Sequence, residues 1–126
     1  MSTLAKTFLL LTAFCVASCT TVSEKTELTL VGQWQWTDSR HTAEYVFLRD
    51  GTFTGFVTGD GALLSRFTGK WHVREGAILY HYISDKTGRI QAGTRDRDKL
   101  LAAAPDHFVI EAADGSVRKY VRVKGG

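Results

Sequence analysis

Histidine, aspartate and serine side chains are the groups of this chain that could support metal binding or catalysis. The chain has four histidines, which are His41, His72, His81 and His107. None of them lies in an H-x-H or H-E-x-x-H spacing, and no serine lies in a G-x-S-x-G motif. Asp96 and Asp98 alternate with Arg95 and Arg97, a pattern that solvated ion pairing explains without a catalytic role. We therefore expect no catalytic residue, no metal site and no cofactor, and we predict that the protein is not an enzyme.

The N-terminal segment carries the pattern of a secretory signal. Lys6 precedes an apolar run over residues 7–16, TFLLLTAFCV, which is too short to span a bilayer as a permanent helix. Small residues follow and end in the sequence Val16-Ala17-Ser18-Cys19. Residues 1–18 are thus predicted to be a signal peptide. The four residues VASC resemble the lipobox of bacterial lipoproteins.

That resemblance implies a lipid anchor at Cys19. In lipoproteins the signal is cut before this cysteine, which receives a diacylglyceryl group on sulfur and a fatty acid such as palmitate on its new amine. Cys15 leaves with the signal, so acylation accounts for the one remaining thiol, and several acyl chains hold a protein stably on a membrane. Thr20 follows where an aspartate commonly retains lipoproteins in the inner membrane, which implies the outer membrane, facing the periplasm. The alternative is an ordinary signal peptide cut near Ala17 or Ser18.

Length and charge exclude several classes of protein. The 126 residues allow one domain, and 44% hydrophobic with 23% charged residues is ordinary for a globular protein. Lys and Arg number 16 against 13 Asp and Glu, and loss of Lys6 with the signal leaves a net charge of +2. No polybasic run is present, so we expect no nucleic-acid partner.

The rest of the chain divides into a tether and a run of short strands. Residues 19–27 are polar after the cysteine and predict a flexible tether holding the domain about 15 Å from the lipid. From Leu28 to Gly126, alternating apolar segments separated by Asp-Gly and Glu-Gly pairs predict antiparallel hairpins. The expected strands lie near 30–38, 43–49, 52–58, 64–73, 77–84, 88–94, 107–113 and 116–123.

Two hairpins allow the register to be predicted. A three-residue loop with Gly51 in the left-handed position pairs Phe47 with Phe53 and Tyr45 with Gly55, which stacks aromatic rings on one face. Around Asp114-Gly115, a two-residue loop fits better and sets Glu111 beside Arg118. That loop gathers one apolar face, made of Phe108, Ile110, Ala112, Val117, Val121 and Val123.

Residues 94–105 remain ambiguous between two structures. Asp96 or Asp98 could cap one or two helical turns that end before Pro105, and a strand from Lys99 to Ala103 fits nearly as well. About eight strands in so short a chain form a barrel or a sandwich. We favour a small antiparallel up-and-down β-barrel, because closure removes exposed edges.

Several motifs resemble those of lipocalins and the shorter bacterial lipocalin-like domains. Residues 30–34, LVGQW, resemble the G-x-W opening of that family. Residues 47–53, FLRDGTF, resemble its second hairpin, and Gly69-Lys70-Trp71 repeats the glycine-x-tryptophan theme. Asp114-Gly115 with residues 120–122 is similar to the closing hairpin. The resemblance covers most of residues 30–123 and implies an antiparallel barrel that often holds a small apolar molecule.

The resemblance also assigns structural roles to three residues. Gly32 and Trp34 correspond to the first strand, where the indole plugs the closed end of the barrel. Arg122 corresponds to a late arginine that stacks on this tryptophan, and a partly desolvated guanidinium on an indole contributes about 1–2 kcal/mol. We therefore predict contact between Arg122 and Trp34.

The aromatic residues are numerous enough to fill a barrel of this size. Most are expected in the core, and the larger set is Trp34, Trp36, Tyr45, Phe47, Phe53, Trp71, Tyr80 and Tyr82. For a ligand pocket at the open end, the candidates are Trp36, Phe56 and Tyr82. Two functional hypotheses remain. One is an envelope lipoprotein whose barrel binds a small apolar ligand such as a fatty acid. The other is a barrel that binds a protein, as an envelope assembly or stress factor or as a hydrolase inhibitor.

Overall fold

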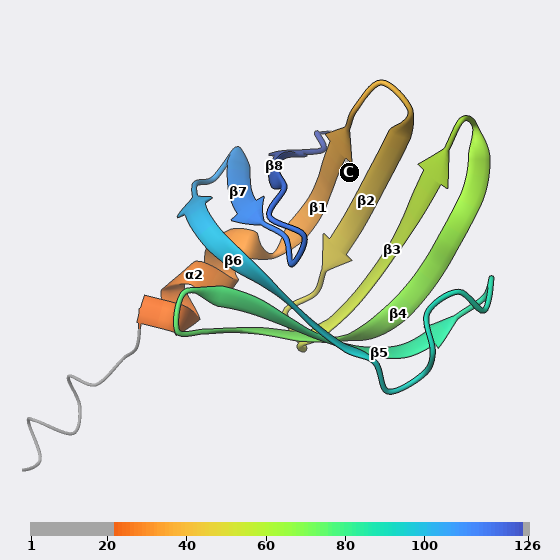
Figure 1. Cartoon of the computed structure of the whole chain (residues 1–126). Helices are drawn as coiled ribbons and strands as arrows, with labels where there is room; N and C mark the ends of the chain where they lie inside the picture. Colours follow the sequence, from red (N-terminus) through yellow and green to blue (C-terminus); the bar gives the residue numbers. More distant parts are fainter. Residues whose placement is uncertain (1–21, 125–126) are drawn as a thin grey trace, which may run out of the picture.

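The computed structural model describes residues 22–124, which form one helix followed by eight strands (Figure 1). The helix is α2 (Val22–Leu30), and the strands are β1 (Gly32–Thr37), β2 (His41–Phe47), β3 (Thr52–Gly59), β4 (Ala62–Arg74), β5 (Ala77–Asp85), β6 (Arg95–Ala103), β7 (His107–Glu111) and β8 (Val117–Arg122). Seven of the eight expected strands lie within two residues of these bounds.

The eight strands close into a barrel. Each strand pairs antiparallel with the next along the chain, and β1 pairs with β8 through Trp34↔Arg122 and Gln35↔Val121. The prediction of a small antiparallel up-and-down β-barrel is confirmed. Because the sheet closes around a core of its own, we expect residues 20–126 to fold without the segment that precedes them.

The β2–β3 hairpin has the predicted register. Phe47 pairs with Phe53 and Tyr45 with Gly55. The Leu48 amide donates to the Thr52 carbonyl over 2.9 Å, which leaves a three-residue loop, and Gly51 has φ of 88°. A left-handed backbone at this position favours glycine, so the sequence signal and the observed turn agree.

The β7–β8 hairpin differs from its prediction by one residue. The Ala112 amide donates to the Ser116 carbonyl over 2.8 Å, so the loop has three residues instead of two. Asp114 stabilises this turn by accepting hydrogen bonds from the Ser116 amide and hydroxyl. Glu111 therefore pairs with Val117 and not with Arg118.

The one-residue shift exchanges the two faces of β8, because neighbouring side chains on a strand point to opposite sides. Val117 and Val121 are exposed, where the predicted register had placed them on the apolar face. Tyr120 is buried opposite Phe108, and Arg118 lies opposite the buried Ile110. Arg118 and Tyr120 thus face the interior.

The segment at 88–94, predicted to be a strand, is a loop, and the sixth strand is Arg95–Ala103. The Asp85 carboxylate organises this loop by accepting hydrogen bonds from the Ser65 hydroxyl and the Thr87 and Ile90 amides. These bonds fold the chain back at the point where a continuous hairpin was expected. Of the two alternatives for residues 94–105, the strand is correct.

Residues Val22–Leu30, of which Val22–Glu27 were predicted to belong to a flexible tether, form α2. The helix is held by contacts from distant residues: the Glu27 carboxylate accepts a hydrogen bond from the Val73 amide, and Leu30 is fully buried. A nine-residue helix is marginal by itself in water, which explains why its local sequence did not predict it. Within residues 22–124, no helix has the length and apolar character needed to cross a membrane.

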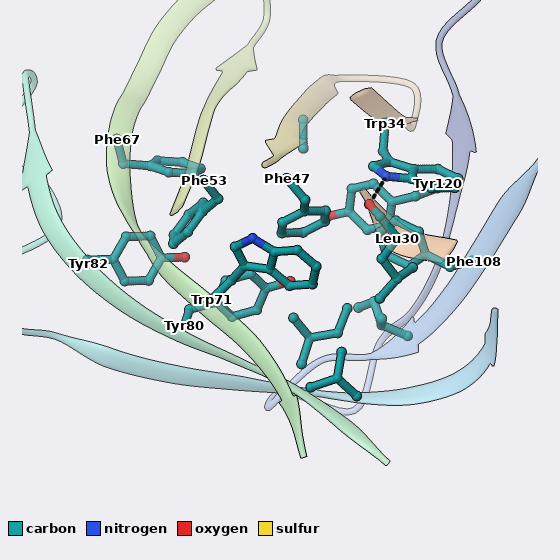
Figure 2. Packing of buried hydrophobic residues seen from close by; sticks show 14 residues of the cluster. Leu30, Trp34, Phe47, Phe53, Phe67, Trp71, Tyr80, Tyr82, Phe108 and Tyr120 are labelled. Carbon is teal, nitrogen blue, oxygen red and sulfur yellow. Dashed lines mark hydrogen bonds between the residues drawn. The ribbon is translucent and has the colours of Figure 1, made fainter. Parts of the chain in front are cut away.

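Aromatic rings make up most of the packed core of the barrel (Figure 2). Tyr45 lies within 6.2 Å, centroid to centroid, of five other rings. At the end covered by α2, called the closed end below, Trp34 and Phe108 meet edge to face at 4.9 Å. The opposite end, where the β1–β2, β3–β4 and β7–β8 turns lie, is called the mouth.

Candidate functional site

The closed end is built around Trp34 and Arg122. Trp34 is fully buried, and its indole nitrogen donates a hydrogen bond of 2.8 Å to the Leu30 carbonyl (Figure 2). The Arg122 guanidinium lies 4.2 Å from the centre of the Trp34 ring. The predicted contact between these residues is confirmed.

Arg122 also ties three chain segments together. Its nitrogens donate to the carbonyls of Pro105, Val31 and Thr29 at 2.6, 2.9 and 2.8 Å. Gly32 has φ of 136°, and a Cβ at this position would collide with the Arg122 guanidinium. The set Gly32, Trp34 and Arg122 thus closes the barrel interior at this end.

The mouth contains a cavity of about 240 Å³. Its lining combines aromatic, small apolar and charged side chains, namely Trp36, Asp38, His41, Ala43, Tyr45, Val57, Arg118 and Tyr120. The Arg118 guanidinium lies 4.8 Å from the centre of the Trp36 ring. A planar cationic group therefore covers one wall of the cavity.

The three candidate pocket residues do not share one pocket. Trp36 lines the mouth, Tyr82 is buried in the core against Phe53 and Phe67, and Phe56 lies on the outer face of β3. The position of Phe56 follows from the predicted β2–β3 register itself: since Gly55 faces inward opposite Tyr45, its neighbour must face outward.

Sequence reasoning missed Tyr45, Arg118 and Asp98 as residues of the mouth and its floor. Arg118 was missed because the two-residue β7–β8 loop that the sequence favoured turns it outward, whereas the observed three-residue loop turns it into the barrel. For Asp98, the usable signal was the alternation Arg95-Asp96-Arg97-Asp98-Lys99. On a strand, this alternation places the aspartates on the opposite face from the arginines and the lysine instead of pairing them. No salt bridge joins the arginines and aspartates of this run among the residues that the structure describes.

Asp98 is a partly buried carboxylate beneath the mouth. Burial raises its pKa to about 6, the nearby Asp96 adds to this rise, and hydrogen bonding to Tyr80 and the charge of Arg118 oppose it. Burial likewise raises the pKa of Tyr120 to about 12 and holds the pKa of Tyr45 well above its usual range.

All four tyrosines of the chain contribute to this interior. They are Tyr45, Tyr80, Tyr82 and Tyr120, and each is buried by at least one neighbouring ring. Burial raises the pKa of both Tyr45 and Tyr82 above its usual range. Tyr45 and Tyr120 line the mouth cavity, and their phenol hydroxyls can donate hydrogen bonds to a polar group of a ligand.

A second hollow, of about 400 Å³, lies on the outer face of β2 to β5. Phe56 forms its apolar part, and the Arg66 guanidinium lies 5.5 Å from the Phe56 ring centre. Glu44, Ser84 and Lys86 complete a polar rim. This hollow is separate from the barrel interior.

The histidines do not gather into a metal site. Within residues 22–124, no three His, Cys, Asp or Glu side chains are grouped so that they could hold a metal ion. His41 and His107 instead contact neighbouring carboxylates, Asp38 at 3.2 Å and Asp106 at 2.8 Å.

Comparisons with known proteins bear on the fold. No protein-family model matches the chain, and no curated protein matches it. Among solved structures, the crystal structure of a lipocalin-like protein from Bacteroides uniformis is similar, with a TM-score of 0.56 and 19% sequence identity. The match covers 75% of this chain and 99% of that one. Together with the closed eight-stranded antiparallel barrel, this similarity shows that the chain has a lipocalin-like fold.

Proposed function

We propose that this protein is a non-enzymatic, lipid-anchored component of the bacterial cell envelope whose barrel binds a small, partly apolar molecule. The observation that carries the ligand proposal is the aromatic-lined cavity at the mouth. The VASC motif carries the proposal of an anchor at Cys19, which lies outside the described residues. Outer-membrane attachment facing the periplasm is the location that this motif and Thr20 support.

The cavity restricts the size and chemistry of the ligand. Its volume of about 240 Å³ is below the roughly 300–1,000 Å³ of sites that enclose drug-sized molecules. A fragment-sized molecule, or one end of a longer lipid, matches this space. Trp36, Tyr45 and Val57 supply an apolar surface, and Arg118 supplies a cation for a carboxylate or another acidic group.

Native mass spectrometry of residues 20–126 purified from periplasm tests the ligand proposal. We expect a copurified mass that denaturation releases. Ala43→Leu places a larger side chain in the mouth, because Ala43 lines the cavity and is 2% exposed, and it should abolish retention of that mass. The matched control is Ala102→Leu at an exposed position on β6. A mass retained equally by both variants would place the ligand elsewhere.

If native mass spectrometry shows the protein without a copurified molecule, a second measurement is needed. Trp36 is the tryptophan at the mouth, whereas Trp34 and Trp71 are buried. Titration with short and long fatty acids should therefore change tryptophan fluorescence in the natural chain and not in Trp36→Phe. Absence of both a copurified mass and a fluorescence response would reject ligand binding.

The anchor is tested on the full chain in bacteria. Labelled palmitate should enter the protein, and Cys19→Ser should abolish incorporation and release the protein from membranes. Cys15→Ser is the matched control, since that residue is removed with the signal. Incorporation that survives Cys19→Ser would reject the anchor.

The outer hollow around Phe56 favours protein binding as a second candidate function. It is larger than the mouth cavity, at about 400 Å³, and presents the Phe56 ring beside the Arg66 guanidinium. A stoichiometric envelope protein captured by the natural chain, and lost with Phe56→Ser, would support this alternative.

A further inference from the structure

The strand β6 sorts its charged side chains by face. Its first five residues are Arg95, Asp96, Arg97, Asp98 and Lys99, and side chains on a strand alternate between the two sides of the sheet. Asp98 is turned into the barrel beside Tyr80. Arg95, Arg97 and Lys99 are all exposed on the outer face. A run that is nearly neutral in sequence therefore presents only cations outward at these positions.

The neighbouring strands extend this positive surface. Three rows of directly paired residues cross β4, β5 and β6, and they are Lys70–His81–Arg95, His72–Leu79–Arg97 and Arg74–Ala77–Lys99. We name their outward Lys, Arg and His side chains the basic face: Lys70, His72, Arg74, His81, Arg95, Arg97 and Lys99. Folding thus gathers cations that are dispersed along the chain.

The basic face has few charges to neutralise it. Among the described residues, no salt bridge involves its lysines or arginines. Two carboxylates accompany it: Asp96 is exposed between Arg95 and Arg97 and accepts a hydrogen bond from the Arg97 amide, and Glu111 pairs with Lys99 across β6 and β7. The seven Lys, Arg and His side chains of the basic face outnumber these carboxylates, so the face can attract an anionic partner.

Apolar groups and a hollow accompany these cations. A depression of about 410 Å³ is lined by Lys70, His72, Leu79, Tyr80, His81, Arg95, Asp96 and Arg97. Ile83 and Leu101, near the ends of β5 and β6, are 49% and 48% exposed. Cations beside exposed aliphatic side chains suit a surface that offers both anionic groups and hydrocarbon.

The described part of the chain begins beside this face, at α2. α2 contacts β4 and β6, and Figure 1 shows it next to the β4–β5 hairpin. Glu27 fixes the helix to the Val73 amide, one residue before Arg74 of the basic face. Cys19 stands three positions before Val22, so an acylated Cys19 lies within roughly 11 Å of the start of α2. An anchor at this place keeps the basic face within reach of the bilayer.

From these observations we propose that the basic face is a docking surface for an anionic phospholipid bilayer. The barrel rests on the membrane through β4 to β6, and the phosphate headgroups pair with Lys70, Arg95 and Arg97. This orientation rests on the proposed anchor at Cys19, whereas the lipid affinity of the face is a property of the barrel alone. Each cation near an anionic bilayer strengthens binding about fivefold at moderate salt.

Vesicle sedimentation of residues 20–126 tests the face without the anchor. We expect binding to vesicles of phosphatidylcholine and phosphatidylglycerol in a 3:1 ratio, little binding to phosphatidylcholine alone, and weakening as salt is raised. Arg95→Gln with Arg97→Gln should reduce the partition coefficient about 25-fold. The matched control, Lys119→Gln with Lys124→Gln, removes the same charge from exposed sites outside the face and should change it less than threefold.

Three results would overturn the proposal. They are equal binding to neutral and anionic vesicles, equal losses in the two double variants, and absence of vesicle binding. If the chain fails to bind vesicles but retains a mixed-sequence 20-nucleotide DNA, the face is instead a nucleic-acid surface. This fragment lacks Cys19, so failed acylation in cells would leave the vesicle result unchanged. An empty mouth cavity would also leave it unchanged, because the basic face lies on the outside of the barrel. The two proposals therefore fail separately.

Discussion

Arg122 joins the last strand of the barrel to the helix that precedes the first. Its guanidinium donates to three backbone carbonyls and lies 4.2 Å from the Trp34 ring. Two of those carbonyls, of Thr29 and Val31, belong to the C-terminal end of α2 and the residue after it, where a cation is favoured. One side chain thus links β8, the β6–β7 turn and α2.

Replacing Arg122 should therefore cost more than replacing a surface arginine. We expect Arg122→Ala to lower the free energy of unfolding by about 2–3 kcal/mol, because charge-assisted hydrogen bonds are lost and the partly buried carbonyls of Val31 and Thr29 are left unpaired. Arg122→Lys keeps the charge without the planar fork and should lose about half as much. Urea denaturation measures both. The control is Arg40→Ala, whose ion pair with Asp60 is fully exposed and should contribute little to stability. Equal losses at the two sites would contradict the closing role.

Asp98 makes the folded barrel less stable as pH rises, whereas an ordinary ion-paired carboxylate makes a protein more stable as pH rises. Its pKa rises from 3.8 to about 6 on folding, chiefly because of burial. The folded state therefore binds more protons than the unfolded state between these values, and stability falls as pH rises through this window. Below about pH 4 both states are protonated and the effect vanishes.

We expect Asp98→Asn to stabilise the protein at pH 7 by on the order of 1–2 kcal/mol, after allowance for screening by solvent. Thermal unfolding of both proteins from pH 3.5 to 7.5 should show this advantage shrinking as pH falls.

Asp85→Asn is the counterpart. Burial acts to raise the Asp85 pKa, but hydrogen bonds from Thr87, Ser65 and Ile90 outweigh it and lower the pKa. That variant should lose stability by an amount that stays nearly constant across the same pH range and shrinks only below the unfolded pKa of 3.8. Parallel pH profiles of the two variants would reject the assignment.

At the scale of elements, what could be predicted depended on whether the signal was local. The β2–β3 hairpin was predictable because Gly51 and the flanking aromatics lie within a few residues of one another. The β5–β6 loop was not, because Asp85 organises it together with Ser65, twenty positions away. The Trp34–Arg122 contact joins distant positions and was predicted through a family resemblance, not through local pattern.

The helix α2 shows the same dependence on distant partners. Its Glu27 carboxylate accepts a 2.8 Å hydrogen bond from the Val73 amide, forty-six positions away. We expect Glu27→Ala to cost about 1–2 kcal/mol and to increase deuterium uptake over residues 22–31, while β2 to β4 stay protected. Lys25→Ala, at an exposed site on the same helix, is the matched control. Unchanged uptake in α2 would mean that Leu30 and Arg122 hold the helix without Glu27.

At the scale of the whole molecule, closure by β1 and β8 determines both ends of the barrel. The pairing Trp34↔Arg122 brings the guanidinium over the indole, and on the outer face the same register sets Gln35 opposite Val121. We call the pairing of β1 with β8 the seam. Without it, the sheet would have two exposed edges and the mouth would lack the wall that carries Arg118 and Tyr120. The seam is therefore the feature on which the candidate site depends.

A disulfide across the seam tests closure and register together. The two native cysteines, Cys15 and Cys19, precede residue 20, so residues 20–126 provide a cysteine-free background. Directly paired strand residues have Cα atoms about 5 Å apart, within the range that a disulfide bridges. Gln35→Cys with Val121→Cys should therefore oxidise readily and stabilise the barrel by up to about 4 kcal/mol, because the bond closes most of the chain into a loop. Gln35→Cys with Lys119→Cys is the matched control, since Lys119 is shifted by two residues along the same strand face and should cross-link poorly. Gel mobility with and without reductant measures both reactions. Faster oxidation of the control would require a seam slipped by two residues, which would also separate Arg122 from Trp34.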